Sequence, residues 1–365
     1  MALVVLALLG LAALGVVASA VGPGAFVVAA VLALLPLGAV VAAVLWVDRW
    51  EPEPPRALAV AFGWGASVSV LVALVVNSAA LGAFLAAGAD ELAAGAWTAT
   101  AVAPLVEEGI KGLGVLLLFL VWRRFFDGPV DGLVYSACVA AGFAFVENVL
   151  YFGQAVAAAA ADAGPPVAVV FVLRAVVSPF AHVLFTACVG LALGWTARSR
   201  TAWLWAFPLG LLGAVALHAL WNGTASLGDG TGFVAVYVLF QVPFFLGTVG
   251  LVVWLRSREA QVIRARLGDY ASVGWFSPQE VAMLASLAAR RRARAWAAAR
   301  GGRPAARTMR RFQAESTRLA YLRQRMVLDR SDLVRARHDE IALLNRLEAT
   351  RTELAARVAI GAARG

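Results

Sequence analysis

Residues 97–122 read WTATAVAPLVEEGIKGLGVLLLFLVW, an apolar run that is interrupted by two carboxylates and a lysine. The run is long enough for a membrane-spanning helix, which needs about 20 apolar residues. Each charge at membrane depth costs about 2.5–3.5 kcal/mol on insertion scales, so such residues usually serve a function. On a helix, Glu107 and Lys111 are four residues apart and can pair, whereas Glu108 points about 100° away from Glu107. The stretch predicts a transmembrane helix with a functional acidic pair.

The whole chain has the composition of a membrane protein. Of its 365 residues, 62% are hydrophobic, compared with about 45–50% in soluble domains. Repeated apolar runs predict an all-α fold, a polytopic membrane bundle of about eight transmembrane helices with a C-terminal helical appendage. The expected spans are approximately Ala2–Ala20, Ala25–Val47, Ala57–Ala87, Trp97–Trp122, Gly132–Ala160, Val167–Thr196, Trp203–Trp221 and Phe233–Leu255.

The charge is distributed unevenly along the chain. Residues 1–255 contain eight basic and twelve acidic residues, whereas residues 256–365 contain 23 arginines, no lysine and ten acidic residues. This change predicts two domains: residues 1–255, an intramembrane domain, and residues 256–365, a basic helical tail.

Basic residues in the connections predict the orientation of the chain. Arginine occurs in every second connection, and the alternate connections contain neither Lys nor Arg. The connections with arginine are Asp48–Arg56, the one that begins at Arg123, Arg198–Thr201 and the tail after Leu255. Because positive residues are retained on the cytoplasmic side, we expect a multi-pass protein of the cell membrane with both termini in the cytoplasm.

The tail is rich in arginine and has helical periodicity. Ser277-Pro278-Gln279-Glu280 predicts the start of a helix that runs to about Arg300, before the Gly301-Gly302 break. The cluster Arg290–Arg294 suits the anionic lipids of an inner leaflet. Lipid is therefore the expected partner of the tail. Nucleic acid is the alternative partner for such a cluster, and we do not expect it here.

Further polar residues lie inside the other apolar runs. Glu147-Asn148 interrupts the fifth expected span, His182 the sixth and His218 the seventh, where Asn222 follows at i+4. Each one alone has a plain structural explanation, such as a hydrogen bond between helices. Together they exceed what a helical bundle needs. Two His and one Glu can bind a catalytic zinc, and another Glu can act as general base on its water.

The ordered motifs resemble one known family. Glu107-Glu108-Gly109-Ile110-Lys111 matches EExxK, Phe143 to Glu147 matches FxxxE, and His218 to Asn222 matches HxxxN after His182. In this order they are similar to the PrsW family of intramembrane proteases, within the superfamily of CAAX-prenyl proteases and bacteriocin-processing enzymes. The corner Asp48–Pro54 is also similar, and the resemblance covers roughly residues 35–255.

The resemblance implies an intramembrane endopeptidase, of the kind that releases an anti-sigma factor or a similar regulator from the membrane. The resemblance implies a metal, with zinc as the expected ion. Its expected ligands are Glu147, His182 and His218, and Glu107 or Glu108 is the base. In a metal-free glutamate mechanism, Glu107 is the base, and His218 and Asn222 form part of an oxyanion site. Lys111 completes the catalytic motif.

Two other functions use similar residues. A proton-coupled transporter also needs buried Glu, His and Lys, although its typical internal repeat is not evident here. A scaffold that recruits partners through its tail leaves the intramembrane Glu and His unexplained. We therefore expect a peptidase that acts on a membrane-anchored protein near its extracytoplasmic side, with transport as the alternative.

Overall fold

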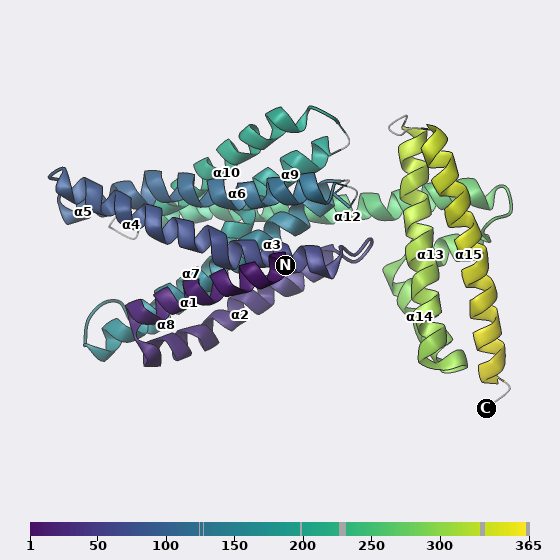
Figure 1. Cartoon of the computed structure of the whole chain (residues 1–365), viewed down its shortest axis with the longest axis horizontal. Coiled ribbons are helices and arrows are strands. Elements are labelled where there is room, and N and C mark those ends of the chain that lie inside the picture. The colour runs from purple at the N-terminus through teal and green to yellow at the C-terminus, as the bar shows by residue number, and fades with distance from the viewer. Residues whose placement is uncertain (124, 127, 198, 226–230, 329–332, 363–365) are drawn as a thin grey trace. The chain divides into compact units, whose positions relative to one another are not determined.

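The computed structural model describes the whole chain except residues 124, 127, 198, 226–230, 329–332 and 363–365. The described residues form helices and their connections, without a strand (Figure 1). This confirms the predicted all-α class. The α-helices (α) and π-helical segments (η) are α1 Ala2–Val21, α2 Pro23–Val47, α3 Pro55–Trp64, η1 Gly65–Ser69, α4 Val70–Ala86, α5 Glu91–Trp97, η2 Thr98–Val102, α6 Ala103–Val121, α7 Pro129–Ala160, α8 Val167–Phe171, η3 Val172–Val177, α9 Ala181–Thr196, α10 Trp203–Ala225, α11 Thr231–Val236, η4 Tyr237–Gln241, α12 Val242–Ala271, α13 Pro278–Leu284, α14 Leu287–Val327 and α15 Leu333–Ala362.

Seven of the described helices are long and apolar enough to cross a membrane. They are Ala2–Val21, Pro23–Val47, Pro55–Ala86, Pro129–Ala160, Val167–Thr196, Trp203–Thr224 and Val234–Ala271. These helices agree with the predicted polytopic bundle. The remaining expected span corresponds to α5, η2 and α6, which follow one another without a break. It falls outside the set of seven because its charged residues interrupt the apolar surface.

The chain separates into two compact units. The first comprises Met1–Asp48 and Glu53–Leu251, and the second comprises Arg49–Pro52 and Val252–Gly365. The second unit therefore includes a short piece of the connection between α2 and α3, besides the tail that the charge distribution predicts.

Helix α7 lies at the centre of the first unit, where α2, α3 and α9 pack against it. Glycines allow these close approaches, because a Cβ atom at Gly190 of α9 would lie 2.1 Å from the carbonyl oxygen of Gly132 in α7. Small residues at such contacts are typical of membrane helices. A further anchor is Trp64 of α3, whose Nε1 donates to the carbonyl oxygen of Ile110 in α6 at 2.9 Å. These contacts fix the helices that carry the polar residues.

The sixth expected span is broken rather than continuous. The π-helical segment η3 ends at Val177, and α9 begins at Ala181 after an irregular turn that contains Pro179. Proline cannot supply a backbone N–H to a continuing helix. As a result, His182 lies in the first turn of α9 rather than in the middle of a long helix.

The second unit is a helical assembly with its own apolar core, in which α14 and α15 pack side by side (Figure 1). The predicted helix start at Ser277 is confirmed, since Ser277 and Glu280 form a capping box. The predicted single helix up to Arg300 is wrong. Helix α13 already ends at Leu284, and α14 continues beyond a kink at Gly301 and Gly302, where Gly302 has φ 68°.

One arginine of the basic cluster is a core residue of the second unit. Arg290 is 4% exposed, donates to the carbonyl oxygen of Leu284 and to Thr317, and lies over the Trp50 ring at 5.0 Å. Arg290 is therefore not available to lipid headgroups, unlike the exposed Arg291 and Arg292. Trp50 itself is buried in this core.

Two buried acids stabilise the corner after α2 within the first unit. Both carboxylate oxygens of Asp48 accept from the backbone N–H of Glu53 at 3.1 Å, and Glu53 accepts from the Tyr135 hydroxyl of α7 at 2.5 Å. Burial raises the pKa of Asp48 to about 7, against the lowering effect of that N–H. The ionised form of Asp48 is thus less favourable in the folded protein than in the unfolded chain.

We expect the pKa of Asp48 to produce a measurable pH dependence of stability. The folded state binds more protons than the unfolded state between the unfolded pKa of 3.8 and about 7, so stability falls as pH rises through this window. The upper bound is about 4 kcal/mol, at 1.36 kcal/mol per pKa unit. Thermal unfolding of wild type and Asp48→Asn across this range tests it. An equally steep dependence in Asp48→Asn would contradict the assignment.

Candidate active site

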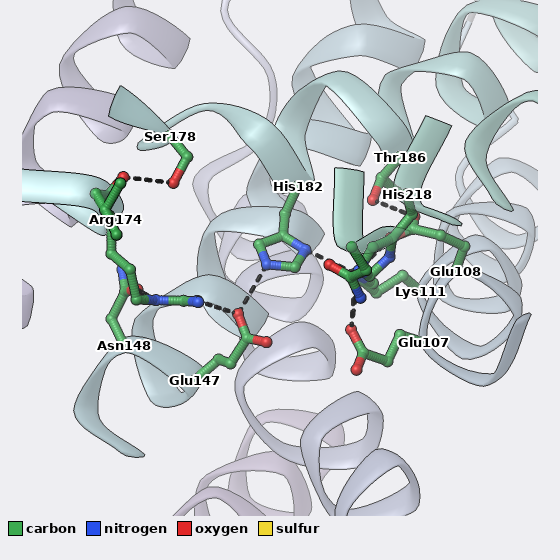
Figure 2. Close-up of polar contacts among 12 residues, drawn as sticks. Glu107, Glu108, Lys111, Glu147, Asn148, Arg174, Ser178, His182, Thr186 and His218 are labelled. Carbon is green, nitrogen blue, oxygen red and sulfur yellow. Dashed lines mark hydrogen bonds and ion pairs between the residues drawn. The ribbon is translucent and has the colours of Figure 1, made fainter. Parts of the chain in front are cut away.

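Polar residues from four membrane helices meet inside the first unit, and we call this group the Glu/His cluster (Figure 2). Its members are Glu107, Glu108 and Lys111 of α6, Glu147 of α7, His182 of α9 and His218 of α10. The cluster brings together six of the seven site residues that the sequence predicts. Their elements are far apart along the chain but adjacent in the bundle.

Glu108 is fully enclosed and fully paired. It is 0% exposed, and its two oxygens accept from Lys111 Nζ at 2.6 Å, His218 Nδ1 at 3.0 Å and Thr186 Oγ1 at 2.9 Å. A buried carboxylate with this many donors is stabilised as the anion. The contact to Glu108 also fixes the tautomer of His218, because Nδ1 carries the proton and Nε2 keeps its lone pair.

Glu147 belongs to a second ion-pair network on the other side of His182 (Figure 2). Its Oε2 accepts from the guanidinium of Arg174 and lies 2.7 Å from His182 Nε2. The same guanidinium donates through Nε to Asn148 Oδ1 at 2.6 Å. Arg174 lies in η3, and π-helical segments frequently occur at functional sites. Arg174 is therefore the counter-ion of Glu147.

His182 connects the two networks. Its Nδ1 lies 3.2 Å from Lys111 Nζ, while its Nε2 contacts Glu147. An ammonium group can only donate, so Nδ1 is the acceptor and Nε2–H is the donor to Glu147. The ring also packs edge-on against Phe143 at 5.3 Å, which holds its plane.

Glu107 has a buried carboxylate oxygen without a hydrogen-bond partner among the residues that the structure describes. Oε1 accepts from Asn77 Nδ2 at 3.3 Å, whereas the buried Oε2 only faces Lys111 Nζ at 3.8 Å and His218 Nε2 at 3.9 Å. Buried polar atoms are nearly always hydrogen-bonded. An oxygen left in this way is typical of a group that binds a proton, a cation or a substrate.

The charges of the cluster do not balance. Three carboxylates, Glu107, Glu108 and Glu147, face two basic side chains, Lys111 and Arg174. Uncompensated charge is costly in a low-dielectric interior. The cluster therefore favours uptake of one more positive charge, either a proton or a metal ion.

The donor set fits a divalent metal ion. One ligand atom from each of Glu107, His182 and His218 lies within 4.8 Å of the others. The unpaired oxygen of Glu107 and the lone pair on His218 Nε2 face each other across this space. Two His and one carboxylate are a common set of protein ligands for catalytic zinc. The carboxylate of this triad is Glu107, whereas Glu147, the ligand expected from the sequence, is bound to Arg174 and His182. His182 would join the triad by giving up its contact with Lys111 or with Glu147.

A cavity of about 270 Å³ gives access to the cluster. Residues of its wall include Glu107, Glu147, His182, His218, Thr98 and Asn222. Asn222 lies at this cavity, where its Nδ2 donates to the carbonyl oxygen of Ala99 in η2 at 2.8 Å. The predicted catalytic asparagine is thus close to the cluster, with its amide aimed at a π-helical segment.

Sequence reasoning missed two residues of the site. Asn77 of α4 contacts Glu107, and Thr186 of α9 contacts Glu108. Asn77 follows an apolar run as a lone amide, which is a weak but readable signal. Thr186 lies one helical turn after His182, and threonine is too common in membrane helices to indicate a site.

Comparisons with known proteins show which family the sequence resembles. Residues 53–248 match the family described as "PrsW family intramembrane metalloprotease". The protein called "Protease PrsW" from Clostridioides difficile (strain 630) is 34% identical over 163 residues, which cover 44% of this chain and 62% of that protein. The "Protease PrsW" of Geobacillus kaustophilus (strain HTA426) is 36% identical over 108 residues, 28% of this chain and 42% of that protein. No solved structure matches the chain.

The fold and the cluster thus define a polytopic membrane protein with buried acid and histidine residues gathered at a cavity. The chain belongs to the PrsW family, since the match covers more than half of its length. It spans less than two thirds of the length of these two relatives.

Proposed function

We propose that the protein is an intramembrane endopeptidase that hydrolyses a peptide bond of a membrane-anchored protein. The observation that carries the proposal is the unpaired Oε2 of Glu107, beside His182 and His218 at a cavity among apolar helices. Membership of the PrsW family supports the same activity. A regulator of the anti-sigma-factor type is the substrate that we propose on the resemblance of the motifs.

Glu107 is the general base in this proposal, rather than Glu108. A base must reach the attacking water and accept its proton. The free oxygen of Glu107 faces the cavity, whereas Glu108 is saturated with three donors and closed off from solvent. Glu108 instead orients His218, in the way that a carboxylate fixes the tautomer of a functional histidine.

The remaining residues position the reacting groups. Lys111 keeps Glu108 ionised and limits the negative charge around Glu107. The ion pair between Arg174 and Glu147 orients His182 from the opposite side. His218 presents Nε2 to the space beside Glu107, where it can donate to the oxyanion of a tetrahedral intermediate once it has taken up a proton. Both ring nitrogens of His182 are engaged by Lys111 and Glu147.

Zinc bound by Glu107, His182 and His218 would polarise the scissile carbonyl and lower the pKa of a bound water. This ligand set differs from the set proposed from the resemblance by having Glu107 in place of Glu147. If a metal engages Glu107, the proton of the water has to pass to another group of the cluster. A metal-free mechanism uses the same residues with Glu107 as the base.

The tail and the orientation complete the proposal. We propose that both termini are cytoplasmic, that the arginine-rich tail contacts anionic lipid through its exposed arginines, and that the tail modulates the enzyme rather than takes part in catalysis.

Glu107 lies about ten residues, or roughly 15 Å, from the outer end of its span. The cut is therefore expected near the extracytoplasmic end of the substrate helix.

Thiol labelling tests the orientation. We expect an impermeant reagent to label Asp90→Cys from outside the cell and Arg200→Cys only after the cytoplasmic face is exposed, because the arginine-rich connections remain inside. Both positions are exposed in the structure. Labelling of Asp90→Cys only from the cytoplasm would contradict the orientation.

A reconstituted assay tests the activity. Purified protein in liposomes is incubated with single-span candidate substrates, with and without a chelator, and products are separated by gel. Cleavage by the wild type is expected. Loss of cleavage with chelator and recovery with zinc would support the metal triad, whereas full activity in chelator would support the glutamate mechanism. Absence of cleavage of every candidate, with transport of protons instead, would overturn the proposal.

A further inference from the structure

A second cavity of about 340 Å³ adjoins the Glu/His cluster. It is lined mainly by apolar residues, among them Phe180, Leu184, Phe185, Leu220, Trp221 and Phe245. Phe185 stacks on the His218 ring at 4.9 Å, and Trp221 lines both this cavity and the one at the cluster. An occupant of the second cavity would therefore lie directly beside the reacting groups.

One buried donor in this wall has no partner. Gln241 ends the π-helical segment η4, and its Nε2 is buried without a hydrogen bond among the described residues. Two other polar side chains of the wall already donate to backbone carbonyls: Ser178 to Leu173 at 2.7 Å, and Tyr237 to Val177 at 3.0 Å. A buried donor left unsatisfied is expensive, so the Gln241 amide requires an acceptor from an occupant.

The occupant is expected to be a peptide rather than a lipid chain. An acyl chain fills an apolar cavity but offers no hydrogen-bond acceptor. A membrane helix that is to be hydrolysed has to unwind locally, and unwinding exposes backbone carbonyls that find no water in the bilayer core. Such a carbonyl satisfies the Gln241 donor, while the neighbouring apolar side chain fills the cavity.

We infer that this cavity, which we call the Gln241 cavity, is a substrate subsite. It receives an apolar side chain next to the scissile bond, and the Gln241 amide donates to a carbonyl of the unwound segment. The inference rests on the proposed peptidase function and adds to it a substrate class: membrane helices that have an apolar residue beside a helix-destabilising one. Gln241 is accordingly a positioning residue that selects unwound substrate.

Peptide binding tests the subsite without requiring cleavage. The full chain with Glu107→Gln is placed in lipid nanodiscs and titrated with two dye-labelled peptides. Both are single-span Leu/Ala helices with Lys ends, and one carries a Gly-Pro pair near its extracytoplasmic end. We expect the interrupted peptide to bind about tenfold more tightly, because it alone can supply a free carbonyl to the buried donor.

Two further substitutions in that background complete the experiment. Gln241→Leu should remove most of the preference while the thermal midpoint stays the same or rises, because an unpaired donor is replaced by an apolar group. Gln261→Leu, the same change at an exposed position of α12, should retain the preference. A retained preference in Gln241→Leu, its unfolding, or failure of both peptides to bind would each overturn the inference.

Cleavage of the interrupted peptide by the wild type is measured in parallel. Cleavage together with an unchanged preference in Gln241→Leu would refute the subsite and leave the peptidase in place. Binding that depends on Gln241 without any cleavage would refute the peptidase and support a peptide-binding cavity.

Discussion

Replacing Glu107 with Gln is expected to lower the rate of peptide-bond hydrolysis by about 10³-fold, within the range for loss of a general base. The amide keeps the shape of the side chain and its contact with Asn77. It can neither accept a proton from water nor act as an anionic ligand at the Glu107–His182–His218 triad. Activity should therefore be lost in both the metal-dependent and the metal-free mechanism.

The same substitution should leave the fold intact. Neutralising Glu107 removes the excess negative charge of the cluster, and replacing a buried charge by a neutral group of similar volume is often neutral or stabilising. Glu91→Gln is the matched control, an exposed glutamate of α5 in the same helical stretch. Initial rates on one substrate and thermal midpoints are compared for the three proteins. A Glu107→Gln rate within tenfold of the wild type would contradict its role as base.

Replacing Lys111 with Met should destabilise the folded protein more than any other single change in the cluster, by about 3–5 kcal/mol. Lys111 and Glu108 are both 0% exposed, and their charged atoms are 2.6 Å apart. Removal of the ammonium group leaves Glu108 as a buried anion that no longer has Lys111 as its counter-ion. The contact to His182 Nδ1 is lost as well.

A double substitution separates this electrostatic effect from a simple packing loss. Lys111→Met with Glu108→Gln removes both charges, so it should recover a large part of the stability lost in the single variant. Arg200→Met, at an exposed connection, serves as the control for loss of a cation. Unfolding in a denaturing detergent gives the free energies. A double variant less stable than Lys111→Met would refute the assigned ion pair.

Much of the cluster could be predicted because charges in apolar helices are conspicuous. Glu107, Lys111, Glu147 and His182 each interrupt an apolar run, and burial of such groups requires partners. The pairing of Glu107 with Lys111 at i,i+4 does occur, at 3.8 Å. The closer partner of Lys111 is nevertheless Glu108 at i,i+3, because Thr186 and His218 from other helices fix that carboxylate.

Other parts of the site depend on tertiary packing that no local pattern specifies. Glu147 pairs with Arg174 because the chain breaks near Pro179. This break lets Arg174 of η3 and His182 of α9 reach the same carboxylate. The burial of Arg290 could not be predicted from the sequence for a similar reason. A run of arginines suggests a solvated face, whereas one of them fills a gap over Trp50, a residue more than two hundred positions away in the sequence.

The most direct test of the central claim is the mass of the cleavage products. Wild-type protein in liposomes is incubated with a single-span substrate in water enriched in a heavy oxygen isotope, beside Glu107→Gln. Hydrolysis predicts one heavy oxygen at the new C-terminus, a cut in the extracytoplasmic half of the substrate helix, and no product with Glu107→Gln. Products without heavy oxygen, a cut on the cytoplasmic side, or the same products with Glu107→Gln would contradict the account.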